Sequence, residues 1–193
     1  MSKLFFILSI ILFLNFSCQK DLKKFEELDT RKSTELIMQI IKDEGDGYLS
    51  ANCILENKKA GAIHLIEEDF EEYLQKQLGI MDTLHLSLQV QLHDDFQITA
   101  DLFPQKKIIT QKKIDEIINN SKDGRTVFSN WLDTNCENEY CFIGKPIFNE
   151  TFDLAYVEIG SYCGNLCGGG ETRIYEYVNG KWVEKKSLSS WVS

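Results

Sequence analysis

Six cysteines give this chain its widest choice of chemistry, because a cysteine can carry a lipid, form a disulfide or bind zinc as a thiolate. Four of them form two close pairs near the C-terminus, with spacings C-x4-C and C-x3-C; the six are Cys18, Cys53, Cys136, Cys141, Cys163 and Cys167. Structural zinc sites usually have tighter spacings and occur in reducing compartments. The compartment of the chain therefore decides between zinc and disulfides.

The N-terminus predicts export. Lys3 precedes Leu4–Phe16, in which all residues are apolar except Ser9 and Asn15. This run makes a helix of roughly 20 Å, whereas the hydrocarbon core of a bilayer is about 30 Å thick. A basic start, a short apolar stretch and a small residue before Cys18 are typical of a secretory signal peptide. Residues 1–17 are thus expected to be removed.

A cysteine as the first mature residue resembles the bacterial lipoprotein pattern, in which the thiol is diacylated and the new amino terminus is acylated. Leu14 and Asn15 depart from the commonest lipobox and look like the looser boxes of Bacteroidota lipoproteins. Gln19-Lys20-Asp21 is similar to the polar tag that sends such proteins to the cell surface. The resemblance implies that Cys18 is a lipid-attachment site and that the chain is an outer-membrane lipoprotein. An ordinary signal peptide followed by a structural cysteine is the alternative.

An exported chain meets oxidising conditions, which favour disulfides over a metal site. We predict that Cys136 pairs with Cys141 and Cys163 with Cys167, because each pair flanks a short polar loop or turn. Cys53 is then left as a small buried hydrophobic residue.

Two glycine-containing stretches could be read as binding loops. Gly168–Gly170 lacks the Gly-Lys-Ser/Thr ending of a phosphate loop, so we predict a hairpin loop. Asp43–Gly47 faintly resembles a calcium loop, but position twelve is Ile54, which cannot supply the bidentate carboxylate.

The histidines give no clear catalytic or metal site. His85 and His93 fall on the same polar face of the predicted hairpin, but would lie roughly 26 Å apart in an extended chain. No orienting acid is recognisable for a Cys53–His64 nucleophile pair. We therefore predict no catalytic residue, no metal and no cofactor.

Without residues 1–17 the chain carries 20 basic and 30 acidic residues, a formal net charge of −10. Nucleic acid is a poor partner for such a chain, because binding relies on lysine and arginine replacing counterions. The balance favours a basic protein or peptide. The length after residue 17 is sufficient for one hydrophobic core.

The expected helices lie mainly in the first part of the chain. Residues 18–32 are predicted to be a tether, and Ser33 to be the N-cap of a helix with the apolar stripe Leu36, Ile37, Ile40 and Ile41. A second helix is expected over Glu67–Leu78, with Gly79 as its stop. Thr110 is expected to cap a third, and residues 119–124 to form a turn.

The expected strands follow. Leu84–Leu92 alternates apolar and polar residues and predicts a strand, paired as a hairpin with Phe96–Leu102. The last fifty residues predict a β-meander of Phe152–Tyr162, Arg173–Val178 and Trp182–Val192, with Asn179-Gly180 as a type I′ turn.

This order predicts an α+β fold in one domain, residues 33–193, with N-terminal helices and an antiparallel sheet. The strings KPIF, YCGNLCGGG, NGKW and SSWVS are similar to a C-terminal pattern of uncharacterised bacterial, largely Bacteroidota, proteins. That resemblance implies a shape and no activity.

We thus expect a non-enzymatic lipoprotein of the cell envelope that binds a cationic partner. Two alternatives stay open: an envelope enzyme, for example one acting on a glycan, and an inhibitor or immunity-like protein. Whether the chain faces the periplasm or the exterior is open as well.

Overall fold

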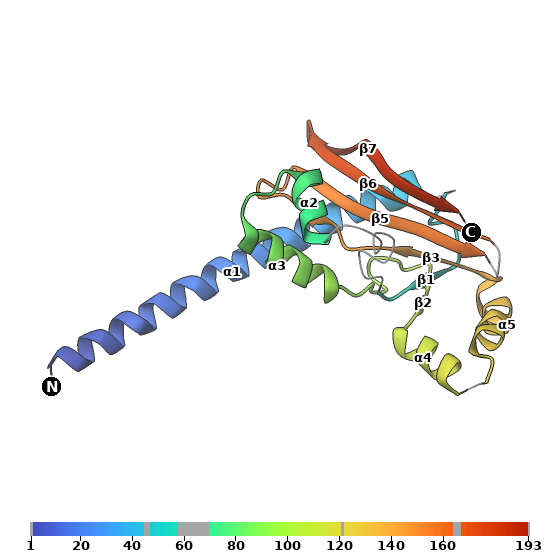
Figure 1. The fold of residues 1–193 in the computed structure, drawn as a ribbon, viewed down its shortest axis with the longest axis horizontal. Helices are drawn as coiled ribbons and strands as arrows, with labels where there is room; N and C mark the ends of the chain where they lie inside the picture. Colours follow the sequence, from blue (N-terminus) through green and yellow to red (C-terminus); the bar gives the residue numbers. More distant parts are fainter. Residues whose placement is uncertain (1, 45–46, 58–69, 121, 164–166, 193) are drawn as a thin grey trace.

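The computed structural model describes residues 2–44, 47–57, 70–120, 122–163 and 167–192. Over these residues the chain forms five helices and a seven-stranded mixed sheet, which confirms the α+β class (Figure 1). The helices are α1 Ser2–Asp43, α2 Phe70–Leu78, α3 Thr83–Asp94, α4 Gln111–Asn119 and α5 Gly124–Cys136. The strands are β1 Cys53–Leu55, β2 Lys107–Ile109, β3 Glu139–Ile143, β4 Ile147–Phe148, β5 Leu154–Cys163, β6 Gly168–Val178 and β7 Lys181–Val192.

The sheet has the strand order β2-β1-β3-β5-β6-β7, with β4 paired to β5. Strand β1 is parallel to both β2 and β3, and the other pairs are antiparallel. The prediction of an antiparallel sheet is therefore wrong at this edge. Parallel neighbours need long crossovers. Helices α2 and α3 lie between β1 and β2, and the connection from β1 to β3 contains α2, α3, α4 and α5.

The predicted C-terminal meander is confirmed by β5, β6 and β7. Asn179 and Gly180 have φ angles of 51° and 81°, the positive values that a type I′ hairpin turn requires. Gly168–Gly170 lies in β6 and not in a hairpin loop. A Cβ atom at Gly170 would lie 2.6 Å from the indole nitrogen of Trp191, so this strand position needs glycine to admit the ring.

Helix α1 differs from the expectation in two ways. It continues through Ser33, which is a buried interior residue of the helix and not its N-cap. Phe25 and Leu28 pack against the core, and Asp29 is buried, so the tether predicted for residues 18–32 is too long. Within the described ranges, no helix combines the length and apolar character needed to cross a membrane.

The core lies on both faces of the sheet. Alternate β5 residues Ala155, Val157 and Ile159 belong to the cluster that contains the α1 residues Leu36, Ile37 and Ile40. Tyr156, which points the other way, packs with residues of α2 and α3, namely Leu74, Leu78 and Leu86. A third cluster joins α5 to β1 and β2 through Cys53, Ile109, Leu132 and Cys136. Helix α1 is therefore fixed against one face of the sheet.

The strand predicted over Leu84–Leu92 is wrong, because these residues form α3. The side chain of Asp82 caps the helix by accepting hydrogen bonds from the backbone N–H groups of Leu84 and His85. The alternating pattern arises because α3 has partners on several sides. Leu86 joins the core, the polar residues His85, Gln89 and His93 are also buried, and Leu84 is exposed.

Residues 96–99 are irregular and residues 100–102 form a turn, so this segment is not the second strand of a hairpin. Ile98 is nevertheless buried, and its N–H donates to the carbonyl of Glu56 over 2.7 Å. The alternation of apolar residues in this segment thus reflects the burial of its side chains and not pairing with another strand.

The other helix predictions are mostly confirmed. Helix α2 begins at Phe70 and ends before Gly79, whose φ is 69°, while residues 67–69 lie outside the described residues. Thr110 caps α4 through a hydrogen bond from the N–H of Lys113. Helix α5 was not predicted.

Candidate functional site

A pocket of about 530 Å³ lies between α1, the segment that follows α3, and Lys145. Its apolar walls are Ile37, Met38, Phe96 and Leu102. Polar side chains complete the lining: Asp29, Thr30, Ser33, Thr34, Gln97, Thr99, Asp101 and Lys145. The volume falls within the range of small-molecule sites, which are mostly apolar and carry a few polar groups.

One face of α1 supplies the inner wall of the pocket. Asp29, Ser33 and Ile37 are spaced by four residues, so they lie above one another on the helix. Ser33 is 4% exposed, and its Oγ has no hydrogen-bond partner among the described residues. A buried hydroxyl without a partner costs free energy, which makes this atom a candidate contact for a ligand.

Asp29 pairs with Lys145, which lies between β3 and β4. The Lys145 Nζ is 2.8 Å from both carboxylate oxygens of Asp29 and donates to the carbonyl of Pro146 over 3.0 Å. The side chains are only 5% and 2% exposed. A buried ion pair of this kind persists only when both charges have close partners.

Helix α3 completes this network, which we call the buried cluster: Asp29, Gln89, His93 and Lys145. The amide of Gln89 donates to Asp29 over 2.9 Å and accepts the N–H of Phe148 over 2.9 Å. The Nδ1 of His93 lies 2.7 Å from the carbonyl of Lys145. The cluster therefore fixes α1, α3 and the start of β4 to one another beside the pocket.

Burial sets the protonation of the cluster. It lowers the pKa of His93 to about 4, although the hydrogen bond to the Lys145 backbone opposes this shift. His93 is thus neutral at pH 7 and donates its Nδ1–H to that carbonyl. Burial also lowers the pKa of Lys145, while Asp29 acts in the opposite direction. Three oxygens already surround the ammonium, and Ser33 does not hydrogen-bond to it, so this geometry does not form a serine–lysine catalytic pair.

The rim of the pocket is polar and acidic. Asp101 is exposed and lines the pocket, and the exposed Asp94 and Asp95 precede the lining residue Phe96. Since Asp29 balances the charge of Lys145, the lining carries one net negative charge from Asp101. The arrangement suits an apolar group that has a positive charge near the mouth of the pocket.

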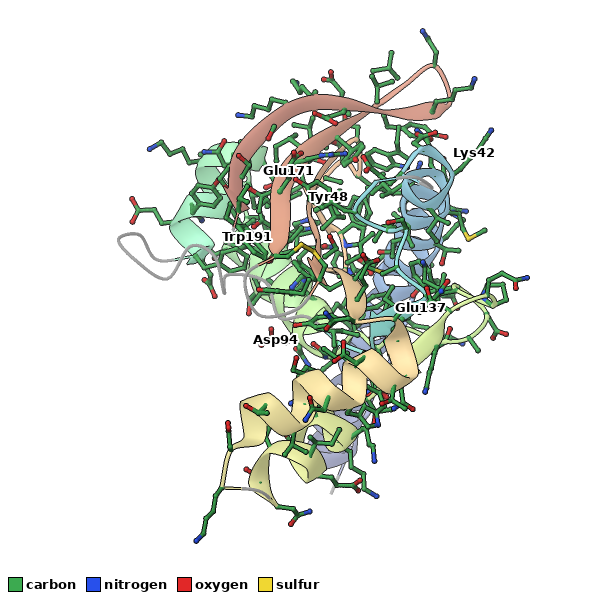
Figure 2. The ribbon with its side chains drawn as sticks, turned by 90° about the vertical axis from the view of Figure 1, so that its right-hand side faces the viewer. Lys42, Tyr48, Asp94, Glu137, Glu171 and Trp191 are labelled. Atoms are coloured by element: carbon green, nitrogen blue, oxygen red, sulfur yellow. A yellow bond between two sulfur atoms is a disulfide. The ribbon has the colours of Figure 1, made fainter. Side chains whose placement is uncertain are left out.

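A second polar cluster lies at the other end of the packed part of α1. Arg173 on β6 contacts Glu44, Glu171 and Glu184, and we call these four residues the Arg173 cluster. The Tyr48 hydroxyl donates to Glu171 over 3.3 Å (Figure 2). Although burial disfavours the charged form, hydrogen bonds to Glu44, Tyr175 and Glu171 raise the pKa of Arg173. This cluster holds the end of α1 to β6 and β7.

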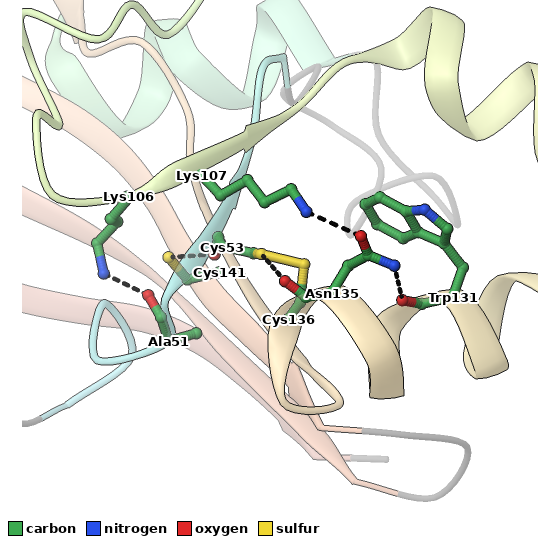
Figure 3. The surroundings of a disulfide bond; sticks show 8 residues. All are labelled: Ala51, Cys53, Lys106, Lys107, Trp131, Asn135, Cys136 and Cys141. Atoms are coloured by element: carbon green, nitrogen blue, oxygen red, sulfur yellow. Dashed lines mark hydrogen bonds between the residues drawn. A yellow bond between two sulfur atoms is a disulfide. The ribbon is translucent and has the colours of Figure 1, made fainter.

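The cysteine predictions are partly wrong. Cys163 pairs with Cys167 as predicted, but Cys136 pairs with Cys53 and not with Cys141 (Figure 3). The spacing could not reveal this bond, because β1 brings Cys53 to the end of α5 across 83 residues. Glu137 and Asn138 both have positive φ and turn the chain from α5 into β3, which leads Cys141 away into the sheet.

Among the cysteines whose side chains are described, Cys141 is therefore the free one, and Cys53 is not. The thiol of Cys141 is fully buried and donates to the carbonyl of Cys53 over 3.3 Å. Burial raises the pKa of Cys141 to about 11, which keeps the thiol protonated at neutral pH.

Of the remaining sequence candidates, His93 lies beside the pocket in the buried cluster, and the others do not line the pocket or lie outside the described residues. His85 and His93 are both buried in α3, about 12 Å apart along the helix axis, and His85 Nε2 lies 2.9 Å from the Phe148 carbonyl. Residues 45–46 of the calcium-like stretch and His64 are outside the described residues. The described residues contain no group of three His, Cys, Asp or Glu that could hold a metal. Cys18 lies on the backbone of α1, and its lipidation stays a prediction.

The sequence patterns assign none of the pocket residues to a functional site, although Ser33, Ile37 and Phe96–Leu102 are expected as parts of helices or strands. Asp29 and Ser33 extend the apolar stripe of α1 toward the N-terminus, and polar residues in such a stripe are a signal for a buried polar site. Lys145 gives a similar signal, because apolar residues lie on both sides of it in the run from Cys141 to Phe148.

The candidate site must be interpreted from its own chemistry: an apolar pocket, a buried ion pair, a hydroxyl without a partner and an acidic rim. Comparisons with models of protein families, with curated proteins and with solved structures find no match to this chain.

Proposed function

We propose that this chain is an outer-membrane lipoprotein that binds a ligand with an apolar group and a positive charge. The pocket between α1 and residues 96–102 carries the proposal, because Ser33 lines it and the buried Ser33 hydroxyl has no hydrogen-bond partner among the described residues. A ligand atom that hydrogen-bonds to Ser33 removes the cost of leaving this group buried and unpaired.

The charge of the ligand follows from the rim and from the whole chain. The exposed Asp101 lines the pocket, and the mature chain has a formal net charge of −10. Such a field raises the encounter rate of cations and lowers that of anions. The apolar walls favour an alkyl or aromatic group, so a basic peptide side chain or a small organic amine has the required chemistry.

The place of action follows from the leader. Lipid at Cys18 attaches the chain to a membrane, and Asp29 lies 11 residues further along α1. At about 1.5 Å per residue, this corresponds to roughly 16 Å of helix. The ligand would therefore be bound close to the membrane surface, as expected for a protein that retains a ligand in the envelope.

The first test compares three probes that share one apolar chain. Hexylamine, hexanol and hexanoate are titrated into a soluble form starting at Gln19, and binding is followed by calorimetry and by NMR shifts of α1. We expect affinity to fall in that order and the binding of hexylamine to weaken as salt rises. Equal binding of the three probes contradicts the proposed cationic ligand.

Two matched pairs of variants locate the site. Thr34 and Thr134 are exposed helix threonines that each donate to the carbonyl four residues earlier, over 2.9 and 3.0 Å. Only Thr34 lines the pocket, so T34W should block binding and T134W should not. Likewise D101N should reduce the preference for hexylamine, whereas D133N makes the same change of charge on α5, away from the pocket.

A further inference from the structure

Three exposed apolar side chains lie at the end of the domain from which the N-terminal part of α1 projects. Met81 is 88% exposed, Leu84 67% and Leu22 40%. Figure 1 shows the connection between α2 and α3, which contains Met81, at the end where α1 leaves the domain. Leu22 also lines a small groove with Leu88 and Leu92 of α3. These residues place one apolar surface next to the exit of the helix.

The most exposed part of this surface is held in a fixed conformation. Gly79 has a φ of 69° and turns the chain after α2. One oxygen of Glu150 accepts the N–H groups of Met81 and Asp82, both over 2.8 Å. Asp82 in turn caps α3, as described above. Met81 is therefore presented to the outside by an ordered connection and Leu84 by the first turn of α3, although their side chains add little to the core.

The position of Cys18 determines how far a lipid on this residue would lie from the exposed apolar surface. The backbone of α1 is helical from Ser2, and Phe25 already packs against His85 of α3 with ring centroids 5.4 Å apart. The seven residues from Cys18 to Phe25 correspond to roughly 10 Å of helix. A lipid on Cys18 leaves no long flexible linker between the bilayer and this end of the domain.

We propose that Leu22, Met81 and Leu84 form a membrane-contacting face that enters the polar–apolar boundary of the bilayer that holds the Cys18 lipid. The inference rests on the proposed lipid attachment and adds an orientation to it. Exposed apolar side chains at this depth exchange water for lipid, which favours contact. The carboxylates of Asp82 and Glu150 lie beside Met81, so the contact should favour zwitterionic over anionic lipid.

The test uses the full chain, processed in a bacterium and reconstituted into phosphatidylcholine vesicles. An environment-sensitive fluorophore is placed by M81C or, as a control, by V192C. Val192 is also 88% exposed, but it lies at the C-terminal end of β7, on the opposite side of the domain (Figure 1). The native free thiol, Cys141, is fully buried and should not react.

We expect the label at position 81 to shift to the blue and to be quenched several-fold more by nitroxide lipids than the label at position 192. In the unlipidated form starting at Gln19, M81S/L84S should reduce the weak partition onto the same vesicles by about tenfold or more, because two apolar contacts are lost. If the emission of the label at position 81 is shifted equally in the absence of vesicles, a second copy or another protein covers the face. That result overturns the inference.

Flotation of the same vesicles separates the two proposals. If the wild-type chain floats and a C18A form without residues 1–17 does not, lipid attachment stands. An unquenched label at position 81 then refutes the membrane-contacting face alone. If neither protein floats, the lipid attachment fails and the orientation fails with it.

Discussion

Two polar clusters join α1 to the sheet, and they place charge in different surroundings. In the buried cluster, one lysine meets one aspartate, and both side chains are at most 5% exposed. In the Arg173 cluster, one arginine meets three carboxylates, whose exposures run from 17% to 43%. The first cluster is electrically balanced and hidden from water, while the second keeps an excess of negative charge and partial access to solvent.

This difference separates structural support from a candidate site. A partly exposed arginine with several acidic neighbours is explained by its contribution to holding α1 in place. A buried ion pair contributes little net stability compared with apolar residues of the same size, because desolvation offsets the attraction. The buried cluster also lies beside a pocket lined by Ser33, whose buried hydroxyl has no partner in the described part of the chain. Its cost is more readily explained by ligand binding than by folding.

The largest effect is expected when the balance of the buried cluster is broken. D29A leaves the Lys145 ammonium buried without its counterion, which should cost about 3–5 kcal/mol of unfolding free energy. Urea unfolding followed by tryptophan fluorescence measures this loss.

The double variant D29L/K145M is the matched control, because it removes both charges. It should recover most of the loss, apart from about 1–3 kcal/mol for the amide of Gln89, which loses its acceptor. A D29A protein as stable as the wild type would show that Lys145 reaches water and that the pair is not buried in solution.

A smaller effect is expected from the pH dependence of the same cluster. The pKa of His93 is about 4 in the folded chain and about 6.5 when unfolded, because burial disfavours the imidazolium. The unfolded chain therefore binds a proton first, so stability is complete above pH 6.5 and falls as the pH drops toward 4. At about 1.4 kcal/mol per pKa unit, the loss from His93 is about 3 kcal/mol.

H93Q tests this assignment, since glutamine can still donate to the Lys145 carbonyl but does not titrate. Urea unfolding at pH 7 and at pH 4.5 should show a smaller drop for H93Q than for the wild type. Carboxylates shared by the two proteins cancel in that difference. An equal drop in both proteins would assign the acid sensitivity to other groups.

The sequence predicts some parts of this molecule well, for physical reasons. The β5–β6–β7 meander is built from neighbouring segments, and Asn179-Gly180 has one strongly preferred turn, so local pattern is sufficient. Thr110 and Gly79 likewise act through the chain next to them.

The failures occur where distant residues decide. The alternation in Leu84–Leu92 predicts a strand. The segment instead belongs to a helix, in which Gln89 hydrogen-bonds to Asp29 and His93 to the backbone of Lys145, and both partners are distant in the sequence. Cys53 reaches Cys136 only because β1 lies beside β3. The pocket needs α1, Lys145 and residues 96–102 together, and no local pattern in the sequence joins them.

The smallest effect is expected in the Arg173 cluster, and it sharpens the comparison. R173M should cost about 1–2 kcal/mol, because the three carboxylates that lose their partner can still be hydrated. K185A is the matched control in the same β6–β7 hairpin, since Lys185 pairs with Glu176 while both side chains are more than 40% exposed. It should change the unfolding free energy by less than about 0.5 kcal/mol.

Salt distinguishes the two clusters further. In 1 M salt, R173M should lower the unfolding free energy by less than it does at low salt, because salt screens the repulsion among Glu44, Glu171 and Glu184. The loss caused by D29A should stay nearly constant, because its site is buried. If R173M proves as costly as D29A and equally indifferent to salt, the two clusters are alike in their burial, and the case for treating only one of them as part of a site is lost.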